Sequence, residues 1–299
     1  MSVLELVKYH GLGNDFLIVL DEVLVDAVAS SLAGPDPVGE LARALCDRHS
    51  GVGADGLLIS RAAGSGADLR MELRNADGGR AETSGNGLRC FALAAVDAGL
   101  VPGPEILVET DAGVRRAELR ERLGTGCGAV SVEMGTVRTT RSDPLAEAAL
   151  PGSRALPWPA WSVDVGNPHL VLLAPSLKGI VLDAVGPDLE RRRPGGQNVE
   201  IVSYTPANAE LSLLVWERGA GVTLACGSGS VAAAAALHSA GICPARVRVH
   251  NPGGVAEVSL SGVDPLAVVA ELAGAVQRVA RIEVDPEDLR ESTRGVSRS

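Results

Sequence analysis

Two short glycine-rich segments carry the residues of this sequence that could perform acid-base chemistry. Ser84-Gly85-Asn86-Gly87 and Cys226-Gly227-Ser228-Gly229 lie 142 residues apart, and each opens an alanine-rich stretch that is predicted to be helical. The first N–H groups of a helix have no intrahelical partner and carry partial positive charge, so such helix starts can bind a carboxylate. A cysteine at this position, Cys226, is expected to have a lowered pKa and to act as a base or nucleophile. Two such starts could present reactive groups to opposite faces of one ligand.

The two segments belong to a longer internal repeat. Ala98-Gly99-Leu100-Val101-Pro102 and Ala240-Gly241-Ile242-Cys243-Pro244 have the same offset of 142 residues. The predicted strand-turn-strand of Leu4 to Leu20 is matched by Trp161 to Leu173, and the hairpin predicted over Glu105 to Leu119 is matched by Val247 to Leu260. The repeat therefore predicts an α/β (α+β) fold with two pseudo-symmetric domains.

The domain boundaries follow from a change in composition. Thr136 to Ala160 is rich in Pro, Ser and Arg, which is typical of a crossing or linker segment. We therefore expect an N-terminal half of residues 1–135, joined by the C-terminal segment 277–299, and a C-terminal half of residues 136–276. A helix is predicted over Val38 to His49, and the polar residues from Pro286 onward are expected to be frayed.

Composition restricts the class of partner. A net charge of −10 disfavours nucleic acid and anionic membranes, and no apolar run reaches the roughly 18 residues of a membrane span. Nothing at the N-terminus resembles a signal peptide, so a cytoplasmic location is expected. The five cysteines have no CxxC spacing, which indicates neither a disulfide framework nor a metal site. Because the two lysines, Lys8 and Lys178, have no phosphate-binding context, a pyridoxal phosphate enzyme is disfavoured.

Several polar residues could converge on the two predicted helix starts and hold a zwitterion: Asn14, Asn75, Asn86, Asn167, Asn198, Glu217 and Arg218. Arg218 and the helix N–H groups could hold an α-carboxylate, while the amides and Glu217 could fix an ammonium group. His169 and Glu217 could orient the acid-base groups near Cys226.

Structural and other catalytic interpretations compete with this hypothesis. Asparagine beside glycine is ordinary turn chemistry, and a lone histidine such as His169 is more often a hydrogen-bonded structural residue. A phosphate-binding P-loop would need a Gly-Lys-Ser/Thr ending that the sequence lacks. A Gly-x-Ser-x-Gly hydrolase centred on Ser84 would need glycine where Glu82 and Asn86 stand.

A family resemblance joins these segments. In order from Lys8 to Ser230, KYHGLGNDF, GVGADGLL, RNADGGRAETSGNGLRCFA, VGNPH, QNVE and WERGAGVTLACGSGS resemble the successive motifs of diaminopimelate epimerases. The resemblance implies a cofactor-independent amino-acid epimerase of lysine and cell-wall precursor synthesis. It also implies two pseudo-symmetric domains, each a barrel-like sheet around a central helix, with diaminopimelate bound between them, and it leaves a homodimer open. The implied substrate contacts are Asn14, Asn75, Gly85, Asn86, Asn167, Asn198, Glu217, Arg218, Gly227 and Ser228.

The resemblance implies catalytic roles for Cys226, His169 and Glu217, and it has one departure. The family has a second catalytic cysteine at the position of Ser84, so that one thiolate removes the α-proton while an opposing thiol protonates the other face. A serine hydroxyl is far less acidic than a thiol, so inversion is expected to be impaired, whether Ser84 is a natural difference or a substitution that would trap substrate. The alternatives are a one-base lyase or isomerase, a racemase of another amino acid, and a non-catalytic amino-acid-binding protein.

Overall fold

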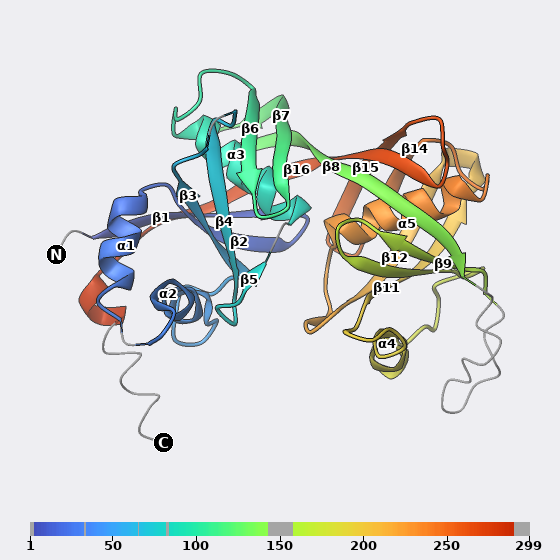
Figure 1. The fold of residues 1–299 in the computed structure, drawn as a ribbon, viewed down its shortest axis with the longest axis horizontal. Coiled ribbons are helices and arrows are strands. Elements are labelled where there is room, and N and C mark those ends of the chain that lie inside the picture. The colour runs from blue at the N-terminus through green and yellow to red at the C-terminus, as the bar shows by residue number, and fades with distance from the viewer. Residues whose placement is uncertain (1–2, 33, 65, 82–83, 143–157, 290–299) are drawn as a thin grey trace. The chain divides into compact units, whose positions relative to one another are not determined.

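The computed structural model describes residues 3–32, 34–64, 66–81, 84–142 and 158–289 of the chain (Figure 1). The chain divides into two compact units. The N-terminal unit comprises residues Met1–Val132 and Ala275–Ser299, and the C-terminal unit comprises Glu133–Gly274. Two strands, β8 (Cys127–Ser142) and β16 (Ala267–Val284), run from one unit into the other.

The two units contain similar series of elements. Besides parts of β8 and β16, the N-terminal unit contains β1 (Leu4–Gly11), β2 (Asn14–Val19), α1 (Glu22–Ala29), α2 (Pro37–Cys46), β3 (Gly56–Arg61), β4 (Leu69–Asn75), β5 (Arg80–Ala81), α3 (Gly85–Asp97), β6 (Glu105–Thr110) and β7 (Gly113–Gly124). The C-terminal unit contains β9 (Ala160–Asp164), β10 (Pro168–Leu173), α4 (Leu182–Glu190), β11 (Asn198–Thr205), a 3₁₀ turn (Pro206–Asn208), β12 (Glu210–Glu217), β13 (Gly221–Val222), α5 (Gly227–Ser239), β14 (Arg246–Asn251) and β15 (Gly254–Ser261).

Strand pairing has the same pattern in both units. The antiparallel pair β1–β2 corresponds to β9–β10, the parallel pair β2–β3 to β10–β11, and the antiparallel pair β3–β4 to β11–β12. The parallel pair β4–β6 and the hairpin β6–β7 are likewise repeated as β12–β14 and β14–β15. The predicted pseudo-symmetry is confirmed.

Strands β8 and β16 close the sheet of each unit. In the N-terminal unit β8 pairs with β7 and β16 with β1, while in the C-terminal unit β8 pairs with β9 and β16 with β15. Strands β8 and β16 also pair with each other. Backbone hydrogen bonds connect the two segments in both units, from Arg278 N–H to Gly126 O at 2.6 Å and from Thr139 N–H to Leu266 O at 2.9 Å. Each sheet is therefore barrel-like, as predicted.

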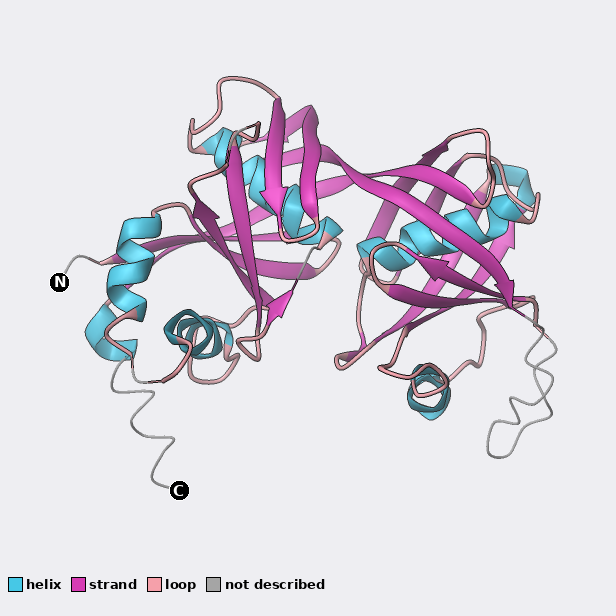
Figure 2. Cartoon of the chain, viewed as in Figure 1, coloured by secondary structure: helices cyan, strands magenta, loops and turns pink. Residues whose placement is uncertain are grey.

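A central helix fills each barrel-like sheet, α3 in the N-terminal unit and α5 in the C-terminal unit (Figure 2). Helix α5 packs against β9 to β12, β14 and β15, and its residues from Val231 to Leu237 have no exposed surface. The alanine run explains this packing, because alanine favours a helix and its short side chain lets strands approach closely. Among the described residues, no helix is both long and apolar enough to cross a membrane.

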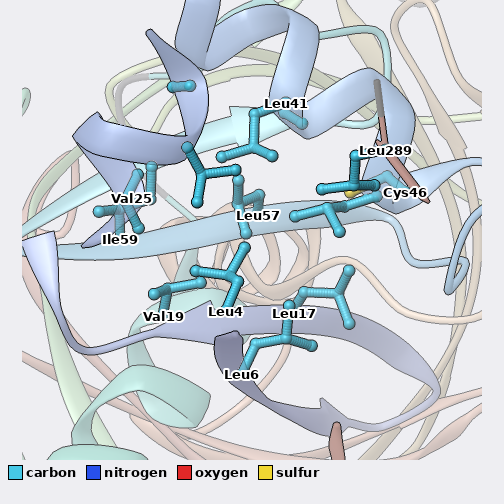
Figure 3. Close-up of a cluster of buried hydrophobic side chains, with 14 of the residues drawn as sticks. Leu4, Leu6, Leu17, Val19, Val25, Leu41, Cys46, Leu57, Ile59 and Leu289 are labelled. Atoms are coloured by element: carbon cyan, nitrogen blue, oxygen red, sulfur yellow. The ribbon is translucent and has the colours of Figure 1, made fainter. Parts of the chain in front are cut away.

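A second apolar layer lies under α1 and α2 in the N-terminal unit (Figure 3). Leu4 and Leu57 from the sheet and Leu41 from α2 are fully buried there. Leu289 also packs into this cluster and is buried, so the prediction of a frayed end from Pro286 is wrong for that residue. Burial of this apolar side chain against the cluster removes its surface from water and so stabilises the folded protein.

Residues 136–142 form the end of β8, which runs from one unit into the other, so they are a crossing segment and the linker alternative is wrong for them. Val137 and Thr139 are buried and Arg138 and Thr140 are exposed, so successive side chains alternate between a buried and an exposed face, as in a strand. Residues 143–157 of the expected linker lie outside the described residues. Helix α2 ends at Cys46, earlier than the predicted His49, and α1 and α4 were not predicted because short amphipathic helices give weak periodicity.

Candidate active site

The start of α5 places Cys226 at the N-cap of the central helix of the C-terminal unit. Its backbone is extended, and its Sγ accepts a hydrogen bond from the Gly229 N–H at 3.3 Å. Sγ also lies 3.4 Å from Ser228 Oγ, while the Cys226 carbonyl accepts the Ser230 N–H at 2.9 Å. The start of α5 therefore holds a buried sulfur atom against its first turn, where the Gly229 N–H contacts it.

The expectation of a lowered pKa for Cys226 is wrong for this structure. Burial raises the pKa of the thiol well above its ordinary value, and the negative charges of Glu217 and Glu200 raise it further. Hydrogen bonds from Ser228 and Gly229 lower the pKa but are outweighed. The helix-end argument considered the local backbone only, whereas desolvation and the two carboxylates come from the surrounding strands. Burial and the two carboxylates therefore favour the neutral thiol, the form that can donate a proton.

A buried hydrogen-bonded chain lies beside this helix start. His169 Nδ1 is 2.7 Å from Glu200 Oε1, and His169 Nε2 is 2.9 Å from Asn167 Oδ1. His169 pairs with Asn198 across the parallel strands β10 and β11, and Glu200, two residues further along β11, points to the same face of the sheet. The side chains of His169 and Glu200 are both fully buried. Strand register thus brings together two predicted residues, Asn167 and His169, and one that the sequence did not indicate, Glu200.

The β12–β13 turn supplies a second group of polar side chains in the C-terminal unit. Asn198 Oδ1 accepts the Arg218 N–H at 2.9 Å, which joins two of the predicted residues. The Arg218 guanidinium donates to Gly195 O at 3.3 Å. Glu217 Oε1 accepts the Thr223 hydroxyl at 2.5 Å, and its charge acts on Cys226. Glu217 is therefore part of the electrostatic environment of the α5 start.

The start of α3 has the same geometry in the N-terminal unit. Ser84 is the N-cap, in an extended conformation, and its Oγ accepts the Gly87 N–H at 3.0 Å. Asn86 Nδ2 donates to Asn14 Oδ1 at 3.3 Å, so these two predicted residues are in contact. Asn75 lies at the end of β4, where its backbone N–H donates to Gly79 O at 2.9 Å.

An ionic network fixes Asn14. Its Nδ2 donates to Asp55 Oδ2 at 2.6 Å, and Arg48 binds both Asp55 and Asp15 at 2.7 Å. Lys8 lies 2.8 Å from the second oxygen of Asp15. Burial tends to raise the pKa of Asp15, but hydrogen bonds from Arg48 and Lys8 outweigh it and lower that pKa to about 2. Asp55 and Arg48 lie in or near motifs quoted from the sequence, yet their supporting role depends on contacts made over about 40 residues, such as that between Asn14 and Asp55.

A buried cation lies behind the α3 start. The Arg89 side chain has no exposed surface, and its Nη2 donates to Asn86 Oδ1 at 2.5 Å. Its Nε and Nη1 have no hydrogen-bond partner within the described part of the chain. Burial lowers the pKa of Arg89 to about 10, so the group still carries its charge at neutral pH. The α3 start is therefore a positive environment, whereas the α5 start contains two carboxylates.

The arrangement supports proton transfer and carboxylate binding. Each unit presents an N-cap side chain that could exchange a proton, and first-turn N–H groups at residues such as Gly85 and Gly227 that could receive a carboxylate. Among the described residues, no group of three or more His, Cys, Asp and Glu side chains could hold a metal ion.

Comparison with known proteins identifies relatives of the chain. The profile of the family "Diaminopimelate epimerase" matches residues 6–140 and 161–279. The diaminopimelate epimerase of Moorella thermoacetica is 39% identical over 267 residues, covering 86% of this chain and 92% of that protein. That of Desulforudis audaxviator is 41% identical over 263 residues, covering 84% and 90%.

A solved structure has the same fold. The hydroxyproline epimerase from Agrobacterium vitis, crystallised with trans-4-hydroxy-L-proline, superimposes with a TM-score of 0.73 over 96% of this chain and 94% of that chain. The two sequences are 18% identical, so this similarity concerns the fold alone.

Proposed function

The chain belongs to the diaminopimelate epimerase family and is an isomerase of the epimerase type, and from this premise we propose that its substrate is diaminopimelate. In this proposal residue 84 and Cys226 are the two acid-base positions. Inversion at the α-carbon proceeds without a cofactor and is impaired because residue 84 is serine.

The observation that carries the proposal is the equivalence of the two helix starts. Ser84 Oγ and Cys226 Sγ occupy the same N-cap position, and each accepts the N–H of the glycine three residues ahead, at 3.0 and 3.3 Å. A two-base inversion needs one group for each face of the α-carbon, and a duplicated unit provides two such groups. The proposal requires that both helix starts reach the same bound substrate.

The proposed substrate contacts divide by charge. The first N–H groups of α3 and α5, at Gly85, Asn86, Gly227 and Ser228, would hold the α-carboxylate and stabilise the charge that develops when the α-proton leaves. Glu217 would fix the ammonium group, and the positive charge of that group would favour loss of the α-proton. Asn14, Asn75, Asn167, Asn198 and Arg218 would bind the remaining polar groups of diaminopimelate.

In the proposed reaction a base takes the α-hydrogen as a proton, and the electron pair of the C–H bond is delocalised into the carboxylate. The opposing acid then gives its proton to the other face of the same carbon. Cys226 suits the acid, because its pKa is raised. Ser84 does not suit the base, because a hydroxyl loses its proton far less readily than a thiol, whose ordinary pKa is about 8.5.

Ser84 also favours a second candidate function. An enzyme that retains a single thiol could act as a one-base lyase or isomerase, or on another amino acid, and a protein without turnover could remain an amino-acid-binding protein. These alternatives predict the same pocket contacts but a different fate of the α-proton.

Binding and proton exchange together test the proposal. In a thermal-shift assay, LL- and meso-diaminopimelate should raise the unfolding temperature of the protein. Lysine is the control, because it lacks the second α-amino-acid centre. Mass spectrometry in deuterated water should show α-deuterium incorporation that accelerates with pH, because Cys226 becomes a base only as its thiol ionises. Inverted product should accumulate much more slowly. Failure of both isomers to bind would contradict the proposed substrate.

A further inference from the structure

Glu200 places a carboxyl group in the apolar interior of the C-terminal unit. Its neighbours Val199 and Ile201 are fully buried, and its own side chain has no exposed surface. Oε1 is 2.7 Å from His169 Nδ1, whereas Oε2 has no hydrogen-bond partner within the described residues. Burying a carboxylate whose Oε2 has no hydrogen bond costs free energy. We therefore expect Glu200 to have a functional role that accounts for its burial.

Gly229 brings this carboxylate against the α5 start. A Cβ at position 229 would lie 2.7 Å from Glu200 Oε1 and 3.2 Å from Cys226 Cβ. The absence of a side chain therefore lets the carboxylate and the cysteine approach the same turn of the helix. The partial positive charge of that helix end stabilises the buried carboxylate. A thiolate at Cys226 would compete for the same charge and would be repelled by Glu200.

We propose that Glu200 is a positioning residue of this site: its buried carboxylate orients His169 and holds Cys226 as a neutral thiol, the form that donates a proton to the substrate. The assignment of donor rests on the function proposed above. The effect of Glu200 on the Cys226 thiol is independent of that function, because it is a property of the C-terminal unit alone.

The hydrogen bonds of His169 define its orientation. Its Nδ1 lies 2.7 Å from Glu200 Oε1 and its Nε2 lies 2.9 Å from Asn167 Oδ1, so both ring nitrogens are held. Asn167 is one of the proposed substrate contacts, so Glu200 fixes its position through the imidazole ring. Removal of the carboxylate is expected to loosen both His169 and Asn167.

The charges around Cys226 come from several strands packed on α5. Glu200 on β11 and Glu217 on β12 both raise the pKa of the thiol, and His169 on β10 is bound to Glu200. The other titratable or charged residues of the strands packed against α5 are half-buried or exposed: Asp164, Tyr204, Glu210, Arg246, Arg248, His250 and Glu257. Glu200 is the fully buried charge of this set that lies at the helix start.

The described residues of the N-terminal unit contain no counterpart of the His169–Glu200 pair. Strand register places Phe16 and Leu58 where the C-terminal unit has His169 and Glu200. The buried charge near the α3 start is instead the Arg89 cation. Two repeats of one unit thus carry buried charges of opposite sign, which fits a proton donor at Cys226 and a proton acceptor at position 84.

Alkylation of Cys226 tests the proposal. The rate of its modification by iodoacetamide, followed by peptide mass spectrometry across a pH series, would be compared in the unsubstituted protein and in Glu200→Gln, which keeps the shape but removes the charge. At neutral pH, Glu200→Gln should react at least about threefold faster, with its profile displaced to lower pH. A tenfold larger fraction of thiolate gives about this threefold increase, because a thiolate of lower pKa is also a weaker nucleophile.

Two variants separate charge from packing. Glu200→Asp retains the charge and should stay within about twofold of the unsubstituted protein by the same thiolate-fraction argument. Glu210→Gln removes a partly exposed carboxylate at the opposite end of β12 from Glu217 and should also leave the rate unchanged. Equal rates in Glu200→Gln and the unsubstituted protein would overturn the proposal, as would an equal acceleration in Glu200→Asp.

An infrared measurement keeps the proposal testable if Glu200→Gln does not fold. The unsubstituted protein at neutral pH should show an S–H stretching band that is lost in Cys226→Ser. Absence of that band would mean that Cys226 is already a thiolate and would overturn the proposal. Neither readout depends on diaminopimelate, so a failure of the proposed function would be recognised separately by the absence of substrate binding.

Discussion

Ser84 and Cys226 hold the same position in two equivalent helices: Ser84 Oγ accepts the Gly87 N–H at 3.0 Å and Cys226 Sγ accepts the Gly229 N–H at 3.3 Å. A serine is a good N-cap, and a cysteine fulfils the same role here. The geometry of capping is therefore the same in both units, while the acidity of the capping group differs. A substitution at position 84 can accordingly keep the capping hydrogen bond while changing how readily the side chain transfers a proton.

Gly229→Ala should destabilise the protein by about 1–3 kcal/mol, because the added methyl group would overlap the buried Glu200 carboxylate. Its Cβ would lie 2.7 Å from Glu200 Oε1. The equivalent substitution Gly87→Ala is the matched control, since its closest neighbour, Ser84 Cβ, lies at 3.2 Å. Urea unfolding should therefore rank Gly229→Ala as the more destabilising variant, and equal losses would contradict close packing at the α5 start.

Asn86→Asp should separate stability from substrate binding. The new carboxylate would pair with the buried Arg89 cation, whose Nη2 is 2.5 Å from Asn86 Oδ1, and would complement the positive end of α3. Loss of the hydrogen bond from Asn86 Nδ2 to Asn14 Oδ1 opposes this gain, so stability should stay close to that of the unsubstituted protein. Affinity for diaminopimelate should fall at least about tenfold through repulsion of the substrate carboxylate.

Thermal unfolding and isothermal titration would measure these two effects of Asn86→Asp. Asn86→Ala is the comparison, because it removes the acceptor of Arg89 without adding charge and should lower stability. Unchanged diaminopimelate affinity in Asn86→Asp would argue against carboxylate binding at the α3 start.

Ionisation of Asp15 should make the free energy of unfolding fall as the pH is lowered into the acid range. Its folded-state pKa is lowered to about 2, so its ionised form is favoured by folding. The resulting stability is fully present above the unfolded-state pKa of about 3.9 and is lost as pH falls through the folded-state value. Asp15→Asn should cost about 2 kcal/mol at neutral pH, and the difference between the two proteins should vanish as pH approaches about 2.

Urea unfolding across a pH series measures the Asp15 effect. Glu105→Gln is the control, because Glu105 pairs with Arg116 at the exposed surface and such pairs contribute little. A stability difference between Asp15→Asn and the unsubstituted protein that persists unchanged into acid would exclude the Lys8–Asp15–Arg48 network as its source.

The parts of the fold that could be predicted from the sequence are those with local signals. A polar, glycine-rich segment that runs into an alanine-rich stretch is typical of a helix start, so the starts of α3 and α5 followed from Gly85 and Gly227. The repeat of these segments predicted two similar units. The end of β8 was missed, because the sequence around Arg138 and Thr140 is polar and the pairing of these residues with β9 supplies the order.

The parts of the candidate site that could not be predicted depend on contacts between distant strands. Glu200 binds His169 over a separation of 31 residues, and nothing local to its motif shows that the pair is buried. The raised pKa of Cys226 has the same origin, since a helix end alone would lower it and the carboxylates of other strands outweigh that effect. A charged residue inside the apolar run around Val199 and Ile201 was the one available signal for Glu200.

Inversion of diaminopimelate by Ser84→Cys tests the central claim most directly. The rate at which LL-diaminopimelate is converted to the meso isomer would be measured for the unsubstituted protein, Ser84→Cys and Ser84→Ala. Ser84→Cys should gain about 10²- to 10⁴-fold, the usual contribution of a positioned acid-base group, while Ser84→Ala should gain nothing. If diaminopimelate binds Ser84→Cys and the inversion rate does not rise, the assignment of residue 84 and Cys226 as the two acid-base positions is contradicted.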